Sequence, residues 1–293
     1  MWKSLEEEPL PEEWRRLPLA KFERTLLRGA LIVAADASNP IRGNLFSAAI
    51  RELVNYLLHR LGPDDEVTAC CWYTPVRNTN GPTRKQRIKY ATQGGLPDSV
   101  IEKAGANVAD LQKEILEAVD DLNRFTHVRP GTVLFKEEEI AVLAGSVLEA
   151  MTSLFASFKE CQSAVGDSMA EQVNRTVLGH LLNETLSGMY NIATHYRQGS
   201  VWIDEITVDE IDAKKISFSF VGSAEADLQW GSDGDVERGD GHVHTASFPM
   251  SGSVWAPVTD IQQLRDLEVE VDTESWFGDR PDDNEEDEAR EPD

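Results

Sequence analysis

Residues 199–208, GSVWIDEITV, decide the fold of this chain, because the spacing of apolar residues changes there. Before this stretch, apolar residues recur at intervals of three and four, which is the period of an α-helix. From Val201 onwards, apolar and polar residues alternate, which is the period of a β-strand. The change predicts an α+β protein, in which a helical bundle is followed by a small antiparallel β domain.

We expect four parts along the chain. An N-terminal segment, 1–37, precedes a helical domain over 38–198 and the antiparallel β domain over 199–262. Between Glu268 and Asp293 the chain carries thirteen acidic residues and two basic ones. We therefore expect an acidic, largely disordered tail over 263–293.

Start and stop signals predict the individual elements. Asn39 before Pro40 is typical of a helix start, and Thr83 with Gln86 forms a capping box. Apolar seams on both sides of Gly166 predict two long helices packed as an antiparallel hairpin. The expected helices cover about 40–61, 84–93, 107–127, 140–161 and 178–196, and residues 67–73 are expected to be extended. The expected strands cover 201–208, 215–221, 224–230, 242–248 and 251–255, with an acidic loop over 231–241.

The composition restricts the compartment and the partners. No run of about 18 apolar residues occurs, so we expect no membrane span. The three cysteines form no disulfide framework, which indicates a reducing cytoplasm. The formal net charge of -24 argues against nonspecific binding to nucleic acid.

One stretch departs from this acidic balance, because residues 67–97 contain no acid. We call it the basic segment. We expect it to contact phosphate groups, or else to dock an acidic partner or the acidic tail. Its basic side chains are Arg77, Arg84, Lys85, Arg87 and Lys89.

A polar cluster closes the helix expected over 107–127, where residues 122–131 read LNRFTHVRPG. Asn123, Arg124 and His127 lie there, away from the apolar stripe of the helix. Arg51 belongs to a second polar stripe, on the first long helix, which also contains Asn44, Ser47 and Asn55. The polar cluster also reads as a helix cap that serves the helix dipole, and Arg51 as an ion-pair partner of Asp120 or Asp121.

If the two stripes face each other across a cleft, they suit metal-independent cleavage of RNA. His127 would act as the general acid or base, and the arginines would stabilise charge on the phosphate. Arg129 and the basic segment would hold the RNA backbone. This route needs no cofactor, and it predicts RNA because DNA lacks the internal 2′-hydroxyl nucleophile.

A second candidate site lies in the acidic loop and the strand after it. Asp233, Asp235, His242 and His244 could complete a divalent-metal site, which would make the protein a metal-dependent nuclease. The alternative is a solvated loop that binds a partner. The chain lacks a Walker A sequence, a Rossmann glycine fingerprint, paired CxxC motifs and a G-x-S-x-G elbow, which disfavours nucleotide hydrolases and serine hydrolases.

Several strings resemble a bacterial family described as predicted nucleases associated with prokaryotic PIWI-type, Argonaute-like conflict systems. They span about residues 38–255. The resemblance implies an effector in bacterial defence against phages or plasmids, which acts with other proteins of a defence system. The strings are NPIRGNLFSAAIRELVNYLLHRLGPDDEVTACCWY, PTRKQRIKYATQGGL, LNRFTHVRPG, LQWGSDGDVERGDG and SFPMSG.

The helical half is also similar to the HEPN superfamily, whose ribonucleases use an arginine and a histidine near a helix end. Their spacing is longer than the two residues between Arg124 and His127 here, so either Arg51 supplies the cation from another helix or the site is inactive. The similarity implies a HEPN-like bundle and a homodimer. A non-catalytic adaptor, which dimerises through its helices and binds a partner through its β domain, is the alternative function.

Overall fold

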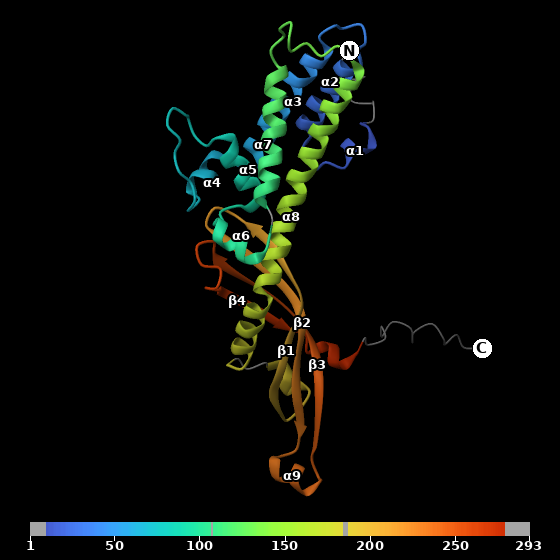
Figure 1. The fold of residues 1–293 in the computed structure, drawn as a ribbon. Coiled ribbons are helices and arrows are strands. Elements are labelled where there is room, and N and C mark those ends of the chain that lie inside the picture. Colours follow the sequence, from blue (N-terminus) through green and yellow to red (C-terminus); the bar gives the residue numbers. More distant parts are fainter. Residues whose placement is uncertain (1–9, 107, 184–186, 279–293) are drawn as a thin grey trace, which may run out of the picture. The chain divides into compact units, whose positions relative to one another are not determined.

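The computed structural model describes residues 10–106, 108–183 and 187–278. Helices dominate the chain up to Leu181 and β-strands dominate it from His195, so the predicted α+β class is confirmed (Figure 1). The chain forms two compact units. The helical unit comprises Met1–Val165 with Glu210–Ile216, and the sheet unit comprises Gly166–Asp209 with Ser217–Asp293.

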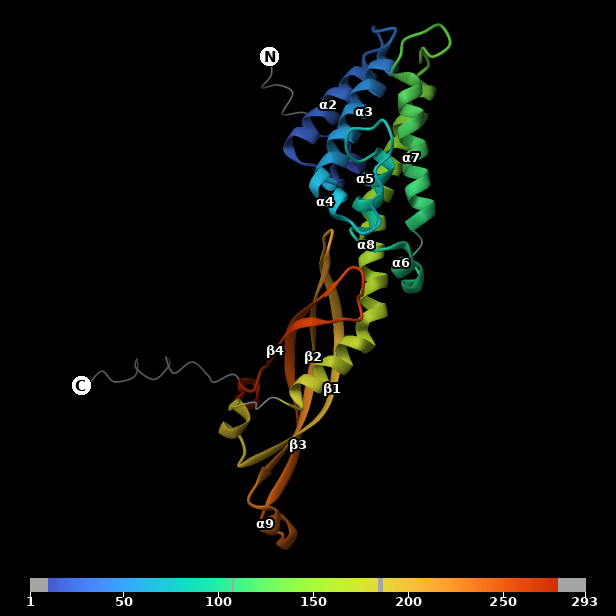
Figure 2. The same ribbon diagram turned by 90° about the vertical axis from the view of Figure 1, so that its left-hand side faces the viewer.

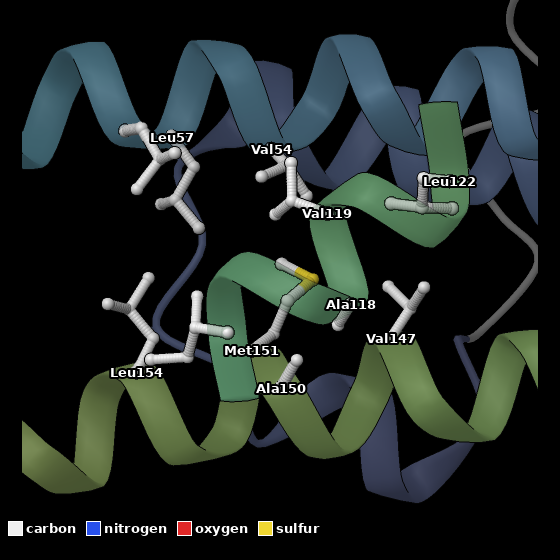
Figure 3. Close-up of a pocket in the computed structure, with 11 residues that line it drawn as sticks. Val54, Leu57, Ala118, Val119, Leu122, Val147, Ala150, Met151 and Leu154 are labelled. Atoms are coloured by element: carbon white, nitrogen blue, oxygen red, sulfur yellow. The ribbon is translucent and has the colours of Figure 1, made fainter. Parts of the chain in front are cut away.

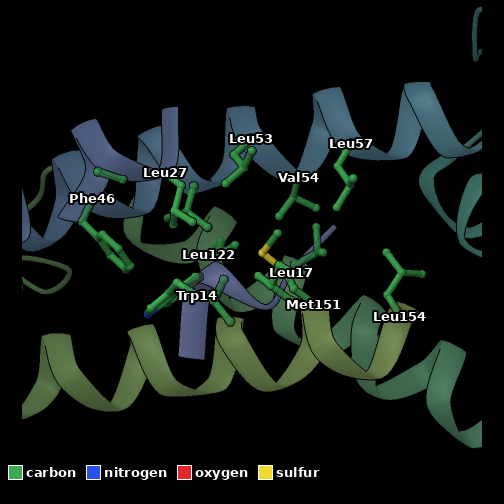
Figure 4. Close-up of a cluster of buried hydrophobic side chains, with 14 of the residues drawn as sticks. Trp14, Leu17, Leu27, Phe46, Leu53, Val54, Leu57, Leu122, Met151 and Leu154 are labelled. Atoms are coloured by element: carbon green, nitrogen blue, oxygen red, sulfur yellow. The ribbon is translucent and has the colours of Figure 1, made fainter. Parts of the chain in front are cut away.

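The helices of the helical unit are α1 (Glu12–Arg15), α2 (Lys21–Ala35), α3 (Arg42–Leu61), α4 (Asp64–Ala69), α5 (Arg84–Gln93), α6 (Asp98–Ala104), α7 (Val108–Phe125) and the first part of α8 (Glu137–Leu181). Most of them share one apolar core, to which α4 and α6 contribute no residue. α2 and α3 lie side by side (Figures 1 and 2). Trp14 and Leu27 meet Leu53, Leu122 and Met151 in this core (Figure 4). Residues 10–35, the part of the N-terminal segment that contributes to this core, therefore pack as part of the helical unit.

The seam between α3, α7 and α8 is apolar and tightly packed. α7 buries Ile115, Val119 and Leu122 at helical spacing, as the sequence pattern predicts. Together with Val54 and Met151, these side chains surround a void of about 20 Å³ (Figure 3). Aliphatic walls offer water no hydrogen-bonding partner, so the void is a packing gap and not a ligand site.

Residues 67–73, expected to be extended, include the end of helix α4, so this part of the prediction is wrong. Asp64, Asp65 and Glu66 occupy the first turn of α4, where the positive end of the helix dipole favours acids. The β-branched residues Val67 and Thr68 favoured a strand on propensity alone. Val67 of α4 is fully buried, and the packing of its side chain outweighs its propensity for a strand.

The helix expected over 140–161 is part of one continuous helix, α8, which runs through Gly166 and ends at Leu181, so the predicted hairpin is wrong. The second expected helix, over 178–196, is wrong beyond Leu181, because its described remainder contains the 3-10 helix η2 (Ser187–Asn191) and the start of β1 (His195–Ile211). Glycine in a helix costs only about 1 kcal/mol relative to alanine, which does not break a long apolar helix. Among the described residues, α8 is also the one helix long and apolar enough to cross a membrane, and 33% of its most apolar window is buried. Core helices of soluble proteins have the same composition, so this gives weak support for a membrane span.

In the described part of the sheet unit, four antiparallel strands lie in the order β1-β2-β3-β4. They are β1 (His195–Ile211), β2 (Lys215–Trp230), β3 (His242–Pro257) and β4 (Arg265–Val271). The predicted alternation is present, but the shorter expected strands join into β2 and β3. Phe218, Phe220 and Phe248 are buried in this unit.

Strand β4 lies inside the segment expected to be a disordered tail. Its apolar residues Leu267, Val269 and Val271 alternate with other residues, and Val271 pairs with Met250 of β3. The many acids of this segment favour a prediction of disorder, but the segment contains a half-buried strand that the pairing with β3 stabilises. Residues 279–293 of the expected tail lie outside the described part of the chain, as does Asn107, near which α7 was expected to begin.

Candidate functional site

One face of α3 carries polar side chains that reach solvent beside α5. Arg51, Asn55 and His59 recur every four residues, so they share one face of the helix. The side chain of His59 is 63% exposed and that of Arg51 is 31% exposed. α5 packs against α3 and brings basic side chains to this face.

The earlier residues of the predicted polar stripe have structural roles. Asn44 is buried, and its Nδ2 donates hydrogen bonds of 2.8 Å to the carbonyl oxygens of both Phe125 and Thr132. Its Oδ1 also accepts a hydrogen bond from the backbone N–H of Leu134. Ser47 is buried as well, and its hydroxyl donates to the carbonyl of Gly43. Asn44 therefore fixes the end of α7 to the start of α3.

The capping box at Thr83, predicted from the sequence, begins α5. The backbone N–H of Gln86 donates to Oγ1 of Thr83 at 3.3 Å, and the backbone N–H of Thr83 donates to Oε1 of Gln86 at 2.8 Å. Arg84 comes next, and its Nε donates to Oδ1 of Asn55 at 3.1 Å. The cap therefore holds a guanidinium against the polar face of α3.

Arg87, one turn further along α5, is a structural residue. It is buried, and its guanidinium donates to the carbonyl of Gly62 at the end of α3. It also pairs with Asp64 at 2.5 Å. Both contacts commit this cation to the protein, so the structure does not support the prediction that Arg87 contacts substrate.

Asp64 connects this buried cation to His59. Its Oδ1 lies 3.8 Å from Nδ1 of His59, too far for a hydrogen bond but close enough for a charge interaction with a protonated imidazole, which the surrounding solvent weakens. The hydrogen bond from Arg87 lowers the pKa of Asp64, and the charges of Arg87 and His59 lower it further. An ionised carboxylate therefore lies beside an exposed imidazole.

We call the group of Arg51, Asn55, His59, Asp64 and Arg84 the His59 surface. It combines an imidazole that can move a proton, an anion that stabilises the imidazolium, and a fixed guanidinium that can bind an oxyanion. Arg51 pairs with Glu52 at 2.5 Å, so its charge is partly balanced. Such a set suits chemistry on a phosphate group.

The end of α7, where the sequence predicts catalytic residues, differs from the His59 surface. Arg124 lies over the ring of Phe125, with its Cζ 5.5 Å from the ring centroid. It lines an open groove of about 570 Å³ together with Asp121, Glu138 and Glu139. Three carboxylates make this groove a poor site for a phosphate.

The other residues predicted at this helix end are held through their backbones. The carbonyl of Asn123 accepts from the hydroxyl of Thr126 at 2.8 Å, and the carbonyl of His127 accepts from the hydroxyl of Thr132. The backbone N–H of Arg129 donates to the same hydroxyl at 3.1 Å. The side chains of His127 and Arg129 are exposed.

Arg51 does not lie at the end of α7. Asn44 contacts that end, and Arg51 is seven residues, about 10 Å, further along α3. Core packing sets the register of α3 against α7, and sequence spacing could not reveal it. The expected ion pair of Arg51 with Asp120 or Asp121 gives way to the pair with Glu52.

The basic segment is divided between structure and surface. Lys89 pairs with Asp98 at 2.7 Å and lies 4.9 Å from the ring centroid of Trp72. Arg77 and Lys85 are exposed, and Arg84 is half-buried beside Asn55. Only part of the segment therefore remains available to a phosphate backbone.

The residues of the metal alternative make other contacts. Asp233 and Asp235 belong to a short helix, α9 (Asp233–Arg238), in the stretch expected to be a loop. Asp235 caps that helix with Ser232, whose hydrogen bonds lower the pKa of Asp235. The rings of His242 and His244 stack on each other, 6.5 Å apart. Within the described ranges, no three histidine, cysteine or acidic side chains form a group that could hold a metal ion.

The sequence prediction missed His59. The signal was present, because His59 continues the stripe of Arg51 and Asn55 by one more turn. What the sequence could not show was that α5, and not α7, supplies the second cation to this stripe.

Two family models match the chain, one over residues 16–151 and the other over residues 158–277. Both are described as Predicted pPIWI-associating nuclease. The chain belongs to the predicted pPIWI-associating nucleases. The family expected from the sequence is thereby confirmed, while the HEPN-like fold stays a prediction. No curated protein and no solved structure matches the chain. In this family member the His59 surface lies wholly within the first matched region.

Proposed function

We propose that this pPIWI-associating nuclease is an endoribonuclease that cleaves RNA without a metal ion, at the His59 surface. The observation that carries the proposal is the arrangement around His59. An exposed imidazole has the ionised Asp64 on its Nδ1 side, and Arg84 is fixed by Asn55 on the same face. Histidine exchanges protons near neutral pH, and a guanidinium binds phosphate oxygens.

In the proposed reaction, Nε2 of His59 removes the proton of the 2′-hydroxyl next to the scissile phosphate. The 2′-oxygen forms a bond to phosphorus, and Arg84 stabilises the added charge on the phosphoryl oxygens. The bond to the 5′-oxygen breaks, and this oxygen takes a proton from water. The products are a 2′,3′-cyclic phosphate and a 5′-hydroxyl. Asp64 stabilises the imidazolium formed in the first step.

The exposed part of the basic segment would hold the RNA backbone beside this surface. Lys85 and Arg77 are exposed near Arg84, in a stretch without acids. Contacts of this kind add affinity without sequence specificity and weaken as salt increases. Binding there offsets the repulsion that the net charge of -24 imposes on RNA.

The family description supports a role beside PIWI proteins, and we propose that the nuclease acts as an effector of a defence system in the cytoplasm. The similarity to HEPN ribonucleases supports a homodimer. Light scattering of the purified protein would test the dimer directly, because a mass of 32.6 kDa is expected for the monomer.

The test of the proposed reaction uses one RNA oligonucleotide and a copy with a single 2′-deoxynucleotide at the mapped cleavage site. We expect cleavage of the RNA in the presence of EDTA, a 2′,3′-cyclic phosphate at the new end, and no cleavage at the substituted position. Cleavage of both oligonucleotides, or loss of cleavage with EDTA, would contradict the proposed reaction.

A further inference from the structure

The sheet unit carries a cluster of aromatic and imidazole rings that the proposed reaction does not use. The ring of Trp230 stacks on His242 at 5.9 Å, and His242 stacks on His244 at 6.5 Å. Trp276, in the 3-10 helix η3 (Glu274–Phe277), contacts both His244 at 5.6 Å and Trp230 at 6.3 Å. We call these four residues the aromatic surface.

This surface is the exposed continuation of a buried core. Along β3, Ala246, Phe248 and Met250 are buried on one face, and His242 and His244 continue that face into solvent. Trp276 connects the cluster to this core, because its ring centroid lies 6.3 Å from that of Phe248. In the described part of the sheet unit, the two histidines belong to no group of side chains that could hold a metal ion.

The polar atom of Trp230 is already satisfied within the sheet unit. Its Nε1 donates to the carbonyl of Ile192 at 2.9 Å. Trp276 is 37% exposed, and both histidines are exposed. The cluster therefore reaches solvent at Trp276 and at both histidines, and aromatic rings attract apolar groups and cations, especially flat guanidinium groups.

Acidic residues flank the rings on both sides in the chain. The segment between Trp230 and His242 contains four acids and one arginine, and Glu274 lies two residues from Trp276. The arginine, Arg238, is already paired with Asp235 at 2.6 Å. We call these acids, which lie close to the rings in the chain, the acidic rim. They repel the phosphates of nucleic acids and of anionic lipid headgroups, and they attract basic side chains.

We propose that the aromatic surface docks an arginine-rich segment of a partner protein, with guanidinium groups stacked on the rings and paired to the acidic rim. Charge complementarity selects a basic protein segment over RNA as the occupant. The proposal does not depend on the nuclease reaction, because every residue that carries it lies in the sheet unit.

The test uses a fluorescent octa-arginine peptide and the full-length protein. The variants are Trp276→Ala and Glu274→Lys, and the matched control is Trp202→Ala, because Trp202 is an exposed tryptophan of β1 outside the surface. We expect about tenfold weaker binding for each of the first two variants, from the loss of one cation–π contact or of charge complementarity, and unchanged binding for the control. We also expect octa-lysine to bind more weakly than octa-arginine.

Equal peptide affinity in wild type, Trp276→Ala and Trp202→Ala would overturn the proposal, because it would show attraction by net charge alone. Single-stranded RNA that competes with the peptide, and that loses affinity in Trp276→Ala, would also overturn it in favour of base stacking. Circular dichroism of each variant shows whether the sheet unit is intact, and His244→Ala provides a second variant should Trp276→Ala fail to fold.

Discussion

Oδ1 of Asp64 lies 3.8 Å from Nδ1 of His59. The same carboxylate pairs with the buried guanidinium of Arg87, and this hydrogen bond lowers the pKa of Asp64. A contact that joins α4 to α5 therefore also keeps a negative charge beside the imidazole. The carboxylate of Asp64 therefore has a structural role toward Arg87 and a chemical role toward His59. Experiments can separate these two roles.

The stabilising effect of Asp64 will depend on pH. Its pKa is lowered in the folded protein, so its contribution is present above the ordinary aspartate pKa of about 3.9 and is lost as the pH falls through the lowered value. Asp64→Asn should reduce the free energy of unfolding at neutral pH, and the gap to wild type should close in acid. Urea unfolding over a pH series measures this. Asp65→Asn is the matched control from the same helical turn, and a gap that persists in acid argues against the ion pair.

Arg87→Met should destabilise the helical unit by about 1–3 kcal/mol, because it leaves the carbonyl of Gly62 and the carboxylate of Asp64 without their partner. Lys85→Met, at an exposed position of the same helix, should change the free energy of unfolding by less than about 0.5 kcal/mol. Denaturant unfolding compares the two variants. Similar free energies of unfolding for the two variants would mean that Arg87 does not stabilise the helical unit.

Asn44→Ala should destabilise the protein by about 1–3 kcal/mol, because the half-buried carbonyls of Phe125 and Thr132 lose their donor. RNA cleavage per folded molecule should not change, since Asn44 is buried away from the His59 surface. Unfolding curves and cleavage rates at a temperature where both proteins are folded test the two halves of this prediction. A large loss of cleavage with unchanged stability would instead indicate a role of Asn44 in catalysis.

Much of the fold could be predicted from residue patterns, because local chemistry determines it. The capping box at Thr83, the apolar stripe of α7 and the alternation in β2 all depend on neighbours in sequence. The course of the chain at Gly166 could not be predicted, because a helix interior tolerates one glycine when packing favours continuity.

The candidate site was harder to predict, because it depends on contacts between distant residues. The spacing of Arg51 and Asn55 predicts a polar stripe, but it cannot show that the helix facing this stripe is α5 and not α7. The hydrogen bond from Arg84 to Asn55 joins residues 29 positions apart, and no local signal encodes it. Likewise, five basic residues in one segment gave no indication that Arg87 is buried.

Arg84→Gln should lower the rate of RNA cleavage by about 100-fold or more, because one donor to the developing charge on the phosphate is lost. Arg84→Lys should restore little of this rate, since an ammonium lacks the fork that binds two oxygens. Arg124→Gln is the control, because Arg124 lies in the acidic groove beside α7. Equal loss of activity in Arg84→Gln and Arg124→Gln would contradict the assignment of the site.

The most direct test of the central claim compares single-turnover RNA cleavage by His59→Ala and His127→Ala. Both histidines are exposed, so neither substitution should unfold the protein, and circular dichroism can verify this. We expect His59→Ala to lose cleavage by about 100-fold or more, as for removal of a general base, while His127→Ala cleaves like wild type. Wild-type cleavage by His59→Ala, with activity lost in His127→Ala, would contradict the account.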